Sequence, residues 1–262
     1  ATVEPALGVT WDGTGYGTDG TIWGGEFLLG DATGFERVAH LRPFRLPGGE
    51  TAVREPRRSA AGVLFELGID LTSAPYGLDS FTERDLGVLT RMLTQRINSP
   101  ITTSAGRLFD AASAMVGLAT VSSFEGQGAM ALEFAASQDD PDPYPMAITK
   151  AEGPLVLDWG PMIEAMLADM GAGIDAGIVA SRFHAGLERG IVEVARQVGH
   201  PRVALTGGCF QNRILTERTA RALRADGFEV LLHSRVPPND GGISLGQAIV
   251  AAASTGQDPA TA

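Results

Sequence analysis

The sequence has 262 residues, of which 44% are hydrophobic, so it is long enough for one large core or for two lobes that meet at a cleft. Its 31 acidic and 20 basic side chains give a formal charge of −11, which disfavours binding to the phosphate backbone of nucleic acids. No apolar stretch approaches the roughly 20 residues that a helix needs to cross a membrane. We therefore expect small molecules or proteins as partners, with no nucleic acid and no membrane.

Two further features bear on the compartment. Residues 1–7 contain neither a basic patch nor the apolar segment of a secretory signal, which makes the cytoplasm the expected location. The single cysteine, Cys209, excludes an internal disulfide framework and a zinc site built from cysteines, in keeping with a reducing compartment.

The chain is expected to begin with a glycine-tipped hairpin. Residues 7–11 and 21–29 read as strands, and the glycine-rich run 12–17 between them is typical of a tight turn. A third strand is expected at residues 35–41. From residue 54 to residue 97 the pattern changes to helix, which predicts a helical insertion at about residues 50–100.

Within this insertion, Thr82 and Asp85 have the spacing of a capping box in its acidic variant, which predicts the start of a helix. The apolar residues that follow recur at helical spacing and are expected on one face: Leu86, Leu89, Leu93 and Ile97.

Helices and strands alternate in the remainder of the chain. Helices are expected at residues 104–116, 125–136, 160–170 and 174–198, and a surface loop at 138–145. A strand-helix-strand unit follows at residues 202–206, 215–224 and 229–232, with a last helix at 241–253. Such a unit predicts an α/β fold. Residues 255–262 are expected to form a frayed tail.

The run 12–17 is the first candidate for binding chemistry. Successive backbone N–H groups at Gly13, Thr14 and Gly15 could form an anion-binding concavity. Asp12 at its base could hold a metal ion that bridges phosphates. Taken alone, such a run is more often a plain hairpin turn.

Gly207 and Gly208 form a second candidate, at the point where a strand ends and a helix begins. Ligands of open α/β sheets bind at such ends, and a glycine pair lets the flat face of a purine lie against the backbone. A tight strand-to-helix turn explains the glycines equally well. Cys209 beside them is expected to be a small buried hydrophobic residue rather than a nucleophile.

Two carboxylates complete the candidates. Asp240 opens the last helix, where it is either the N-cap or a second metal ligand that faces Asp12 across a cleft. Asp110 lies on an otherwise apolar helix and suits the two hydroxyls of a ribose, and Gly106 would leave room for the ligand. A partly exposed helix residue is the alternative for Asp110.

Two weaker features remain. A group of arginines could receive an anion or an acidic partner, although such a group is more often a solvated face: Arg42, Arg45, Arg54, Arg57 and Arg58. His184 lies on an apolar helix and is expected in the core or on the wall of a cleft.

In their order along the chain, these motifs resemble those of the HypF family of hydrogenase-maturation carbamoyltransferases. The resemblance covers about residues 7–250 and is carried by residues 10–17, 23–26, 46–49, 54–58, 124–127 and 239–247. It implies an α/β, actin/hexokinase-like (ASKHA) ATPase fold, mainly the second lobe. Residues 1–254 would then form part of a Kae1-like carbamoyl-transfer domain.

The resemblance also implies an activity. In that family a carbamoyl-adenylate, made from carbamoyl phosphate and ATP, is bound in the cleft with a divalent metal, and its carbamoyl group passes to the C-terminal cysteine thiol of a HypE partner. By motif, the metal ligands are Asp12 and Asp240, and the nucleotide contacts are Gly13, Thr14, Gly15, Gly106, Asp110, Gly207, Gly208 and Asn212. No catalytic nucleophile is assigned, because the attacking thiol arrives on the partner.

The sequence departs from the family pattern in its metal ligands. A first lobe and a His-x-x-x-His motif, which supplies two further ligands in the family, have no counterpart here, and none of the four histidines pair at metal-ligand spacing. We therefore expect weak metal binding by this chain. Two alternatives stay open, namely an ATP-dependent small-molecule kinase of the same fold and a non-catalytic nucleotide-binding or docking fragment.

Overall fold

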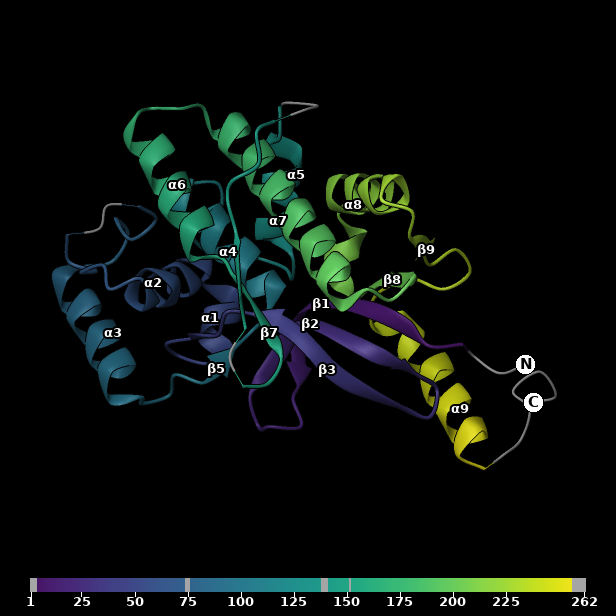
Figure 1. Cartoon of the computed structure of the whole chain (residues 1–262). Coiled ribbons are helices and arrows are strands. Elements are labelled where there is room, and N and C mark those ends of the chain that lie inside the picture. The colour runs from purple at the N-terminus through teal and green to yellow at the C-terminus, as the bar shows by residue number, and fades with distance from the viewer. Residues whose placement is uncertain (1–3, 74–75, 138–140, 151, 256–262) are drawn as a thin grey trace.

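The structure is a computed structural model that describes residues 4–73, 76–137, 141–150 and 152–255 (Figure 1). Its described part contains a mixed sheet in the order β6-β7-β3-β2-β1-β8-β9, with two short strands, β4 and β5, beside β2. The strands are β1 (Ala6–Tyr16), β2 (Ile22–Asp31), β3 (Gly34–Leu41), β4 (Phe44–Arg45), β5 (Ile101–Thr102), β6 (Ala147–Lys150), β7 (Leu155–Asp158), β8 (Arg202–Thr206) and β9 (Glu229–Leu231).

Helices connect these strands and gather mainly on one side of the sheet, while α9 lies apart from the others (Figure 1). The helices are α1 (Glu50–Arg54), α2 (Pro56–Glu66), α3 (Glu83–Gln95), α4 (Ala105–Met115), α5 (Gln127–Ala135), α6 (Gly160–Gly171), α7 (Ala176–Val198), α8 (Arg213–Ala225) and α9 (Ile243–Ser254). Two single turns, η1 (Gly208–Gln211) and η2 (Asp240–Gly242), precede α8 and α9. The predicted α/β fold is confirmed.

The centre of the sheet is β1, which pairs antiparallel with β2 and parallel with β8. Its alternate residues Leu7, Val9 and Trp11 are fully buried, as the period of two along a strand requires. The Trp11 ring packs edge-on against Phe27 of β2, with ring centroids 6.0 Å apart, and lies 6.2 Å from the Phe210 ring of η1. The core therefore continues from the sheet to the turn that follows β8.

The predicted turn at residues 12–17 is wrong. Strand β1 continues to Tyr16, whose partner in β2 is Ile22, and the chain reverses between Gly17 and Thr21. The pairing register shifts between Trp11 and Gly15, so the intervening residues form an irregularity of the β-bulge kind. Bulges re-aim side chains and are common beside active sites. Gly13 thus lies in the bulge, whereas Gly17 lies where the chain reverses.

The helical insertion is present, but it consists of three separate helices, α1, α2 and α3. Pro56 begins α2, and Gly68, with a φ of 75°, follows its end. The capping box of Thr82 and Asp85 is present and starts α3, as predicted. The helix ends before Ile97, which is 52% exposed and does not continue the buried face.

The remaining expectations differ from the structure in detail. The four helices from α4 to α7 and the unit β8-α8-β9 are confirmed within a few residues, but β6 and β7 were not predicted. These strands have only four residues each, which is too short for a recognisable alternation. Residues 138–140 of the expected loop and 256–262 of the expected tail lie outside the described residues.

Helix α9 differs from the other long helices in its surroundings. None of its residues is buried, although most are apolar, and Ile243, Leu245 and Val250 are each about half exposed. Across the described residues, every helix is too short or too polar to pass through a lipid bilayer.

The first turn of α4 lies directly on the bulge of β1. The Ser104 hydroxyl caps this helix by accepting from the Arg107 N–H, and its own proton is shared by the carbonyls of Asp12 and Gly13, at 2.7 and 2.8 Å. A β-carbon at Gly106 would stand 2.7 Å from the Cα of Gly13. Only glycine permits this approach.

A buried polar pair joins α7 to α8. His184 Nδ1 donates to the carbonyl of Ala180 at 2.8 Å, and Nε2 accepts from the Asn212 amide at 2.9 Å. The same amide caps α8 by accepting from the Leu215 N–H. These bonds need the neutral imidazole, and burial lowers the pKa of His184 to about 4. His184 is therefore a core residue, as expected.

Replacing Gly106 by Ala is expected to destabilise the chain by about 1–3 kcal/mol, because the new methyl group must push α4 away from the bulge. Gly87→Ala is the matched control, since nothing lies within 4 Å of its β-carbon position in the middle of α3. It should stabilise the chain by up to about 1 kcal/mol. Urea unfolding measures both, and equal midpoints for the two variants would contradict the close contact.

His184 is expected to make stability depend on pH. Its pKa in the fold, about 4, lies below the ordinary value of 6.5, so its contribution is present above about pH 6.5 and is lost as the pH falls towards 4. The full loss is about 3 kcal/mol. His184→Gln removes this pH dependence. The parent should have the higher urea midpoint at neutral pH, and this advantage should shrink on acidification because only the parent loses stability through His184. A constant difference from pH 7 to pH 4.5 would exclude the role of His184.

Candidate functional site

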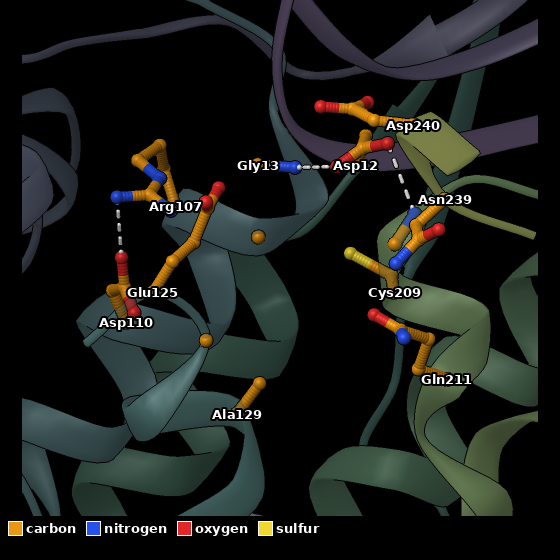
Figure 2. A pocket seen from close by; sticks show the side chains of 13 residues that line it. Asp12, Gly13, Arg107, Asp110, Glu125, Ala129, Cys209, Gln211, Asn239 and Asp240 are labelled. Atoms are coloured by element: carbon orange, nitrogen blue, oxygen red, sulfur yellow. Dashed lines mark hydrogen bonds and ion pairs between the residues drawn. The ribbon is translucent and has the colours of Figure 1, made fainter. Parts of the chain in front are cut away.

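A cavity of about 230 Å³ lies where the bulge of β1, the start of α4 and the turns η1 and η2 meet. Figure 2 shows Arg107, Asp110 and Glu125 on one wall and Cys209 and Gln211 on the opposite wall. Asp12 and Asp240 lie between the two walls at one end (Figure 2). Segments that are far apart in the sequence therefore converge on one space.

Asp12 joins the sheet to the second wall. Its Oδ1 accepts from the N–H of Gly13 at 2.7 Å, and its Oδ2 accepts from the N–H of Gly208 at 3.0 Å. Each oxygen of a carboxylate can accept more than one bond, so Asp12 keeps capacity for a cation. A β-carbon at Gly208 would stand 2.9 Å from Oδ1 of Asp12. A side chain at position 208 would therefore displace the Asp12 carboxylate from its present position.

Asp240 is not the helix cap. The side chain of Asn239 takes that role in η2, since it accepts from the N–H of Gly241 at 3.1 Å. The carboxylate of Asp240 lies next to Asp12 (Figure 2) and makes no hydrogen bond or ion pair with any described residue. Asp240 was expected to be either the N-cap or a metal ligand, and the structure excludes only the N-cap.

These two carboxylates fit a divalent cation only in part. Oxygen ligands suit hard cations, and both residues line the same end of the cavity. Within the described ranges, however, no group of three or more His, Cys, Asp or Glu side chains is arranged to hold a metal ion. Any cation bound here would need ligands from water, substrate or another segment.

A second cavity of about 480 Å³ adjoins the first. It shares Asp12 and Asp240 with the first cavity, and its other walls come from the ends of β1 and β8 and from α9. Gly207 lines this second cavity, where its φ of 99° and its closeness to the Trp11 carbonyl both demand glycine. The two predicted metal ligands therefore stand at the boundary between two cavities.

Arg107 and Asp110 form a buried ion pair on the first wall. Arg107 Nη1 lies 2.9 Å from Asp110 Oδ2, and the two side chains are 3% and 4% exposed. Burial raises the pKa of Asp110 to about 6, Arg107 counteracts the rise and Glu125 adds to it. Asp110 is therefore a deeply buried carboxylate on the cavity wall, not the partly exposed helix residue that was the alternative.

Cys209 lies on the opposite wall and is 8% exposed. Burial and the nearby carboxylates of Asp12 and Asp110 raise the pKa of its thiol far above neutrality. The thiolate, which is the nucleophilic form, is therefore disfavoured. The prediction of a small buried hydrophobic residue is confirmed.

Several predicted contacts do not line the first cavity. Asn212 is buried in its bonds to α8 and His184, while Thr14 is exposed and donates to the Gly13 carbonyl. Gly15 pairs with Trp23 in the hairpin. Gly106 does line the cavity, but the space above it is filled by Gly13 rather than left for a ligand.

The arginines of this group contact other groups of the chain, and Arg57 and Arg58 share the carboxylate of Glu55. Arg42 pairs with Asp158 at 3.2 Å, and Arg58 pairs with Glu55 at 2.7 Å. Arg45 donates to the Ser99 carbonyl. Their partners are structural groups of this chain, so a shared anion site at this cluster is not supported.

Arg107 and Glu125 were not selected from the sequence, although Arg107 follows Gly106 directly and Glu125 lies within residues 124–127, one of the stretches that carry the family resemblance. An arginine in the first turn of an otherwise apolar helix was the available signal. The role of this arginine depends on a segment that is distant in sequence, because Arg107 Nη2 and Glu125 Oε1 both lie close to Gly13 of the bulge.

Comparisons with known proteins identify the family of this chain. Residues 8–247 match a family described as "Carbamoyltransferase, Kae1-like Domain, second subdomain". The chain is 39% identical over 259 residues to "Carbamoyltransferase HypF" of Synechocystis sp., covering 93% of this chain and 34% of that protein. It is 38% identical over 263 residues to a "Carbamoyltransferase HypF homolog" of Cupriavidus necator, covering 95% of this chain and 66% of that protein.

A solved structure shares the fold. The "full-length HypF in the phosphate- and nucleotide-bound form" superposes with a TM-score of 0.89 at 36% identity, covering 95% of this chain and 39% of that one. The chain spans about a third of the length of the first of these relatives. The expected actin/hexokinase-like fold is thereby confirmed, and the chain belongs to the HypF carbamoyltransferase family, in which it corresponds to the second subdomain of the Kae1-like domain.

Proposed function

We propose that this chain supplies one side of a carbamoyl-transfer site, where it binds a carbamoyl-adenylate and presents its carbamoyl group to the C-terminal cysteine thiol of a HypE-type partner. The observation that carries the proposal is the cavity in which Asp12 and Asp240 lie together beside the backbone of Gly13 and Gly208. Two relatives are named carbamoyltransferases, and a solved HypF structure is described as phosphate- and nucleotide-bound.

The reaction is an acyl transfer from a mixed anhydride. The partner's sulfur attacks the carbamoyl carbon, a C–S bond forms, the bond from that carbon to the phosphate oxygen breaks, and AMP leaves while the thiol proton passes to a base. Such a reaction needs position and charge stabilisation more than a protein nucleophile. A reducing compartment such as the cytoplasm suits it, because the acceptor is a free thiol.

The residues of this chain have separate parts in the proposal. Asp12 and Asp240 would hold a divalent cation, which would offset the charge of the adenylate phosphate and of the leaving AMP. Gly13 and Gly208 let backbone approach the ligand, and Asp110 faces the ribose hydroxyls. The adenine is proposed to lie towards the 207–212 loop, where Gly207 opens onto the second cavity.

A nucleotide-binding module without turnover is the alternative. It is favoured by the two-carboxylate metal site, since first-row metals generally take several ligands, with imidazoles among them. No third ligand of the usual kinds joins Asp12 and Asp240 within the described residues. Binding of nucleotide without any carbamoyl transfer in the presence of an upstream His-x-x-x-His segment would select this alternative.

The chain alone is expected to retain little metal and to gain nucleotide affinity when a divalent cation is added. Calorimetric titration with ATP in Mg²⁺ should show a loss of about tenfold, or about 1.4 kcal/mol, in Asp12→Asn and in Asp240→Asn. Glu83→Gln, an exposed residue at the start of α3, is the control and should bind as the parent does. Metal content should rise when the His-x-x-x-His segment is present. Stoichiometric, tightly held metal in the 262-residue chain would contradict this prediction.

Cys209 is expected to be dispensable and unreactive. Because burial raises the pKa of its thiol, iodoacetamide at pH 7 should modify the folded chain about a hundredfold more slowly than the chain in concentrated urea. Cys209→Ala should retain nucleotide affinity and, with the remaining segments of the enzyme present, carbamoyl transfer. Loss of transfer with affinity unchanged would show that the thiol carries the carbamoyl group as an intermediate.

A further inference from the structure

Arg107 and Glu125 have no part in the roles described so far, yet both reach the same place in the cavity. A β-carbon at Gly13 would stand 3.0 Å from Arg107 Nη2 and 3.4 Å from Glu125 Oε1. Figure 2 shows both side chains on one wall, with Asp110 on the far side of Arg107. A cationic donor and an anionic acceptor thus face the space beside the bulge.

The Arg107 guanidinium is buried without being fully satisfied. Its side chain is 3% exposed, and the ion pair with Asp110 engages one nitrogen. Nε has no hydrogen-bond partner among the described residues. Buried polar groups are rarely left unpaired, and such a group on a cavity wall points to a ligand that completes its bonds.

The charge of the cavity lining indicates which kind of ligand would bind beside Arg107. The cavity is lined by one cationic side chain, Arg107, and four carboxylates: Asp12, Asp110, Glu125 and Asp240. One positive and four negative groups give a formal charge of −3 when all are ionised. A phosphate beside Arg107 would therefore meet more repulsion than attraction, and its natural place is with a cation at Asp12 and Asp240. The space between Arg107 and Glu125 suits a neutral group that both accepts and donates.

A carbamoyl group has this character, because its carbonyl oxygen and its NH₂ are bonded to one carbon. We propose that Arg107 and Glu125 recognise the carbamoyl group, an inference that rests on the proposed function. Arg107 donates to the carbonyl oxygen, and Glu125 accepts from the NH₂. Besides its proposed contact with the ribose, Asp110 holds the guanidinium in place through their ion pair. Glu125 then determines specificity, since the methyl of an acetyl group in the same place would displace water from its carboxylate without offering a donor.

Two stable phosphonates test the pair. Phosphonoacetamide carries the H₂N–CO– group, and acetonylphosphonate replaces the NH₂ by a methyl group of similar size. Each is titrated into the full chain in Mg²⁺, with AMP titrated separately. The parent chain should bind the amide at least about tenfold more tightly than the ketone.

The variants separate the two roles. Glu125→Leu should bring the ratio of the two affinities close to one, because only the NH₂ uses this carboxylate. Arg107→Met should weaken both ligands and leave the ratio unchanged, because both contain the carbonyl group. Glu83→Leu on α3 is the control and should retain the parent ratio. Replacing the buried Arg107 could unfold the chain. Glu125 precedes α5 and is exposed, so its replacement should leave the fold intact and still tests the proposal.

Two outcomes overturn the inference in different ways. A chain that binds AMP but shows no preference for the amide, or keeps that preference in Glu125→Leu, excludes the carbamoyl subsite and leaves the proposed function standing. A chain that binds neither AMP nor either phosphonate overturns the proposed function and the subsite with it.

Discussion

The contact between the first turn of α4 and the bulge of β1 sets the position of the charged wall of the cavity. Ser104 bonds to the carbonyls of Asp12 and Gly13, and the absence of a side chain at Gly106 allows the two backbones to touch. Arg107 follows directly, so its guanidinium reaches Gly13 only because the helix begins there. A substitution that moves α4 away from the bulge would therefore displace Arg107 without replacing Arg107 itself.

Asp12 fixes the opposite wall by a different means. Its two oxygens accept from Gly13 within β1 and from Gly208 within η1, so one side chain ties the antiparallel hairpin to the turn after β8. The same carboxylate stands beside Asp240 at the cavity end. A structural role and the proposed ligand-binding role therefore meet in one residue, and the loss of Asp12 is expected to disturb both. Asp240, which has no bond to any described residue, offers the cleaner separation of the two effects.

The sequence predicted the parts of the fold that depend on local pattern. The β8-α8-β9 unit and the capping box of α3 follow from runs of residues that interact within a few positions. The bulge did not follow, because it exists only through the register between β1 and β2. Asp12, Gly208 and Asp240 were selected by type and spacing and do converge on one cavity. Arg107 and Glu125 were missed, because their shared contact at Gly13 joins segments about a hundred residues apart.

The charge of the cavity supports the proposal that the attacking thiol belongs to a partner. Burial raises the pKa of the Cys209 thiol, and the carboxylates of Asp12 and Asp110 raise it further. A thiolate formed there would add a negative charge to a cavity that already holds four carboxylates and one guanidinium. In the proposed mechanism, the attacking thiol instead belongs to a partner and ionises in the partner's own surroundings, while Arg107 binds the oxygen of the carbamoyl carbon that it attacks. The nucleophile is then no part of the cavity walls. One cavity can therefore hold a cation and an adenylate without opposing ionisation of the thiol that attacks the adenylate.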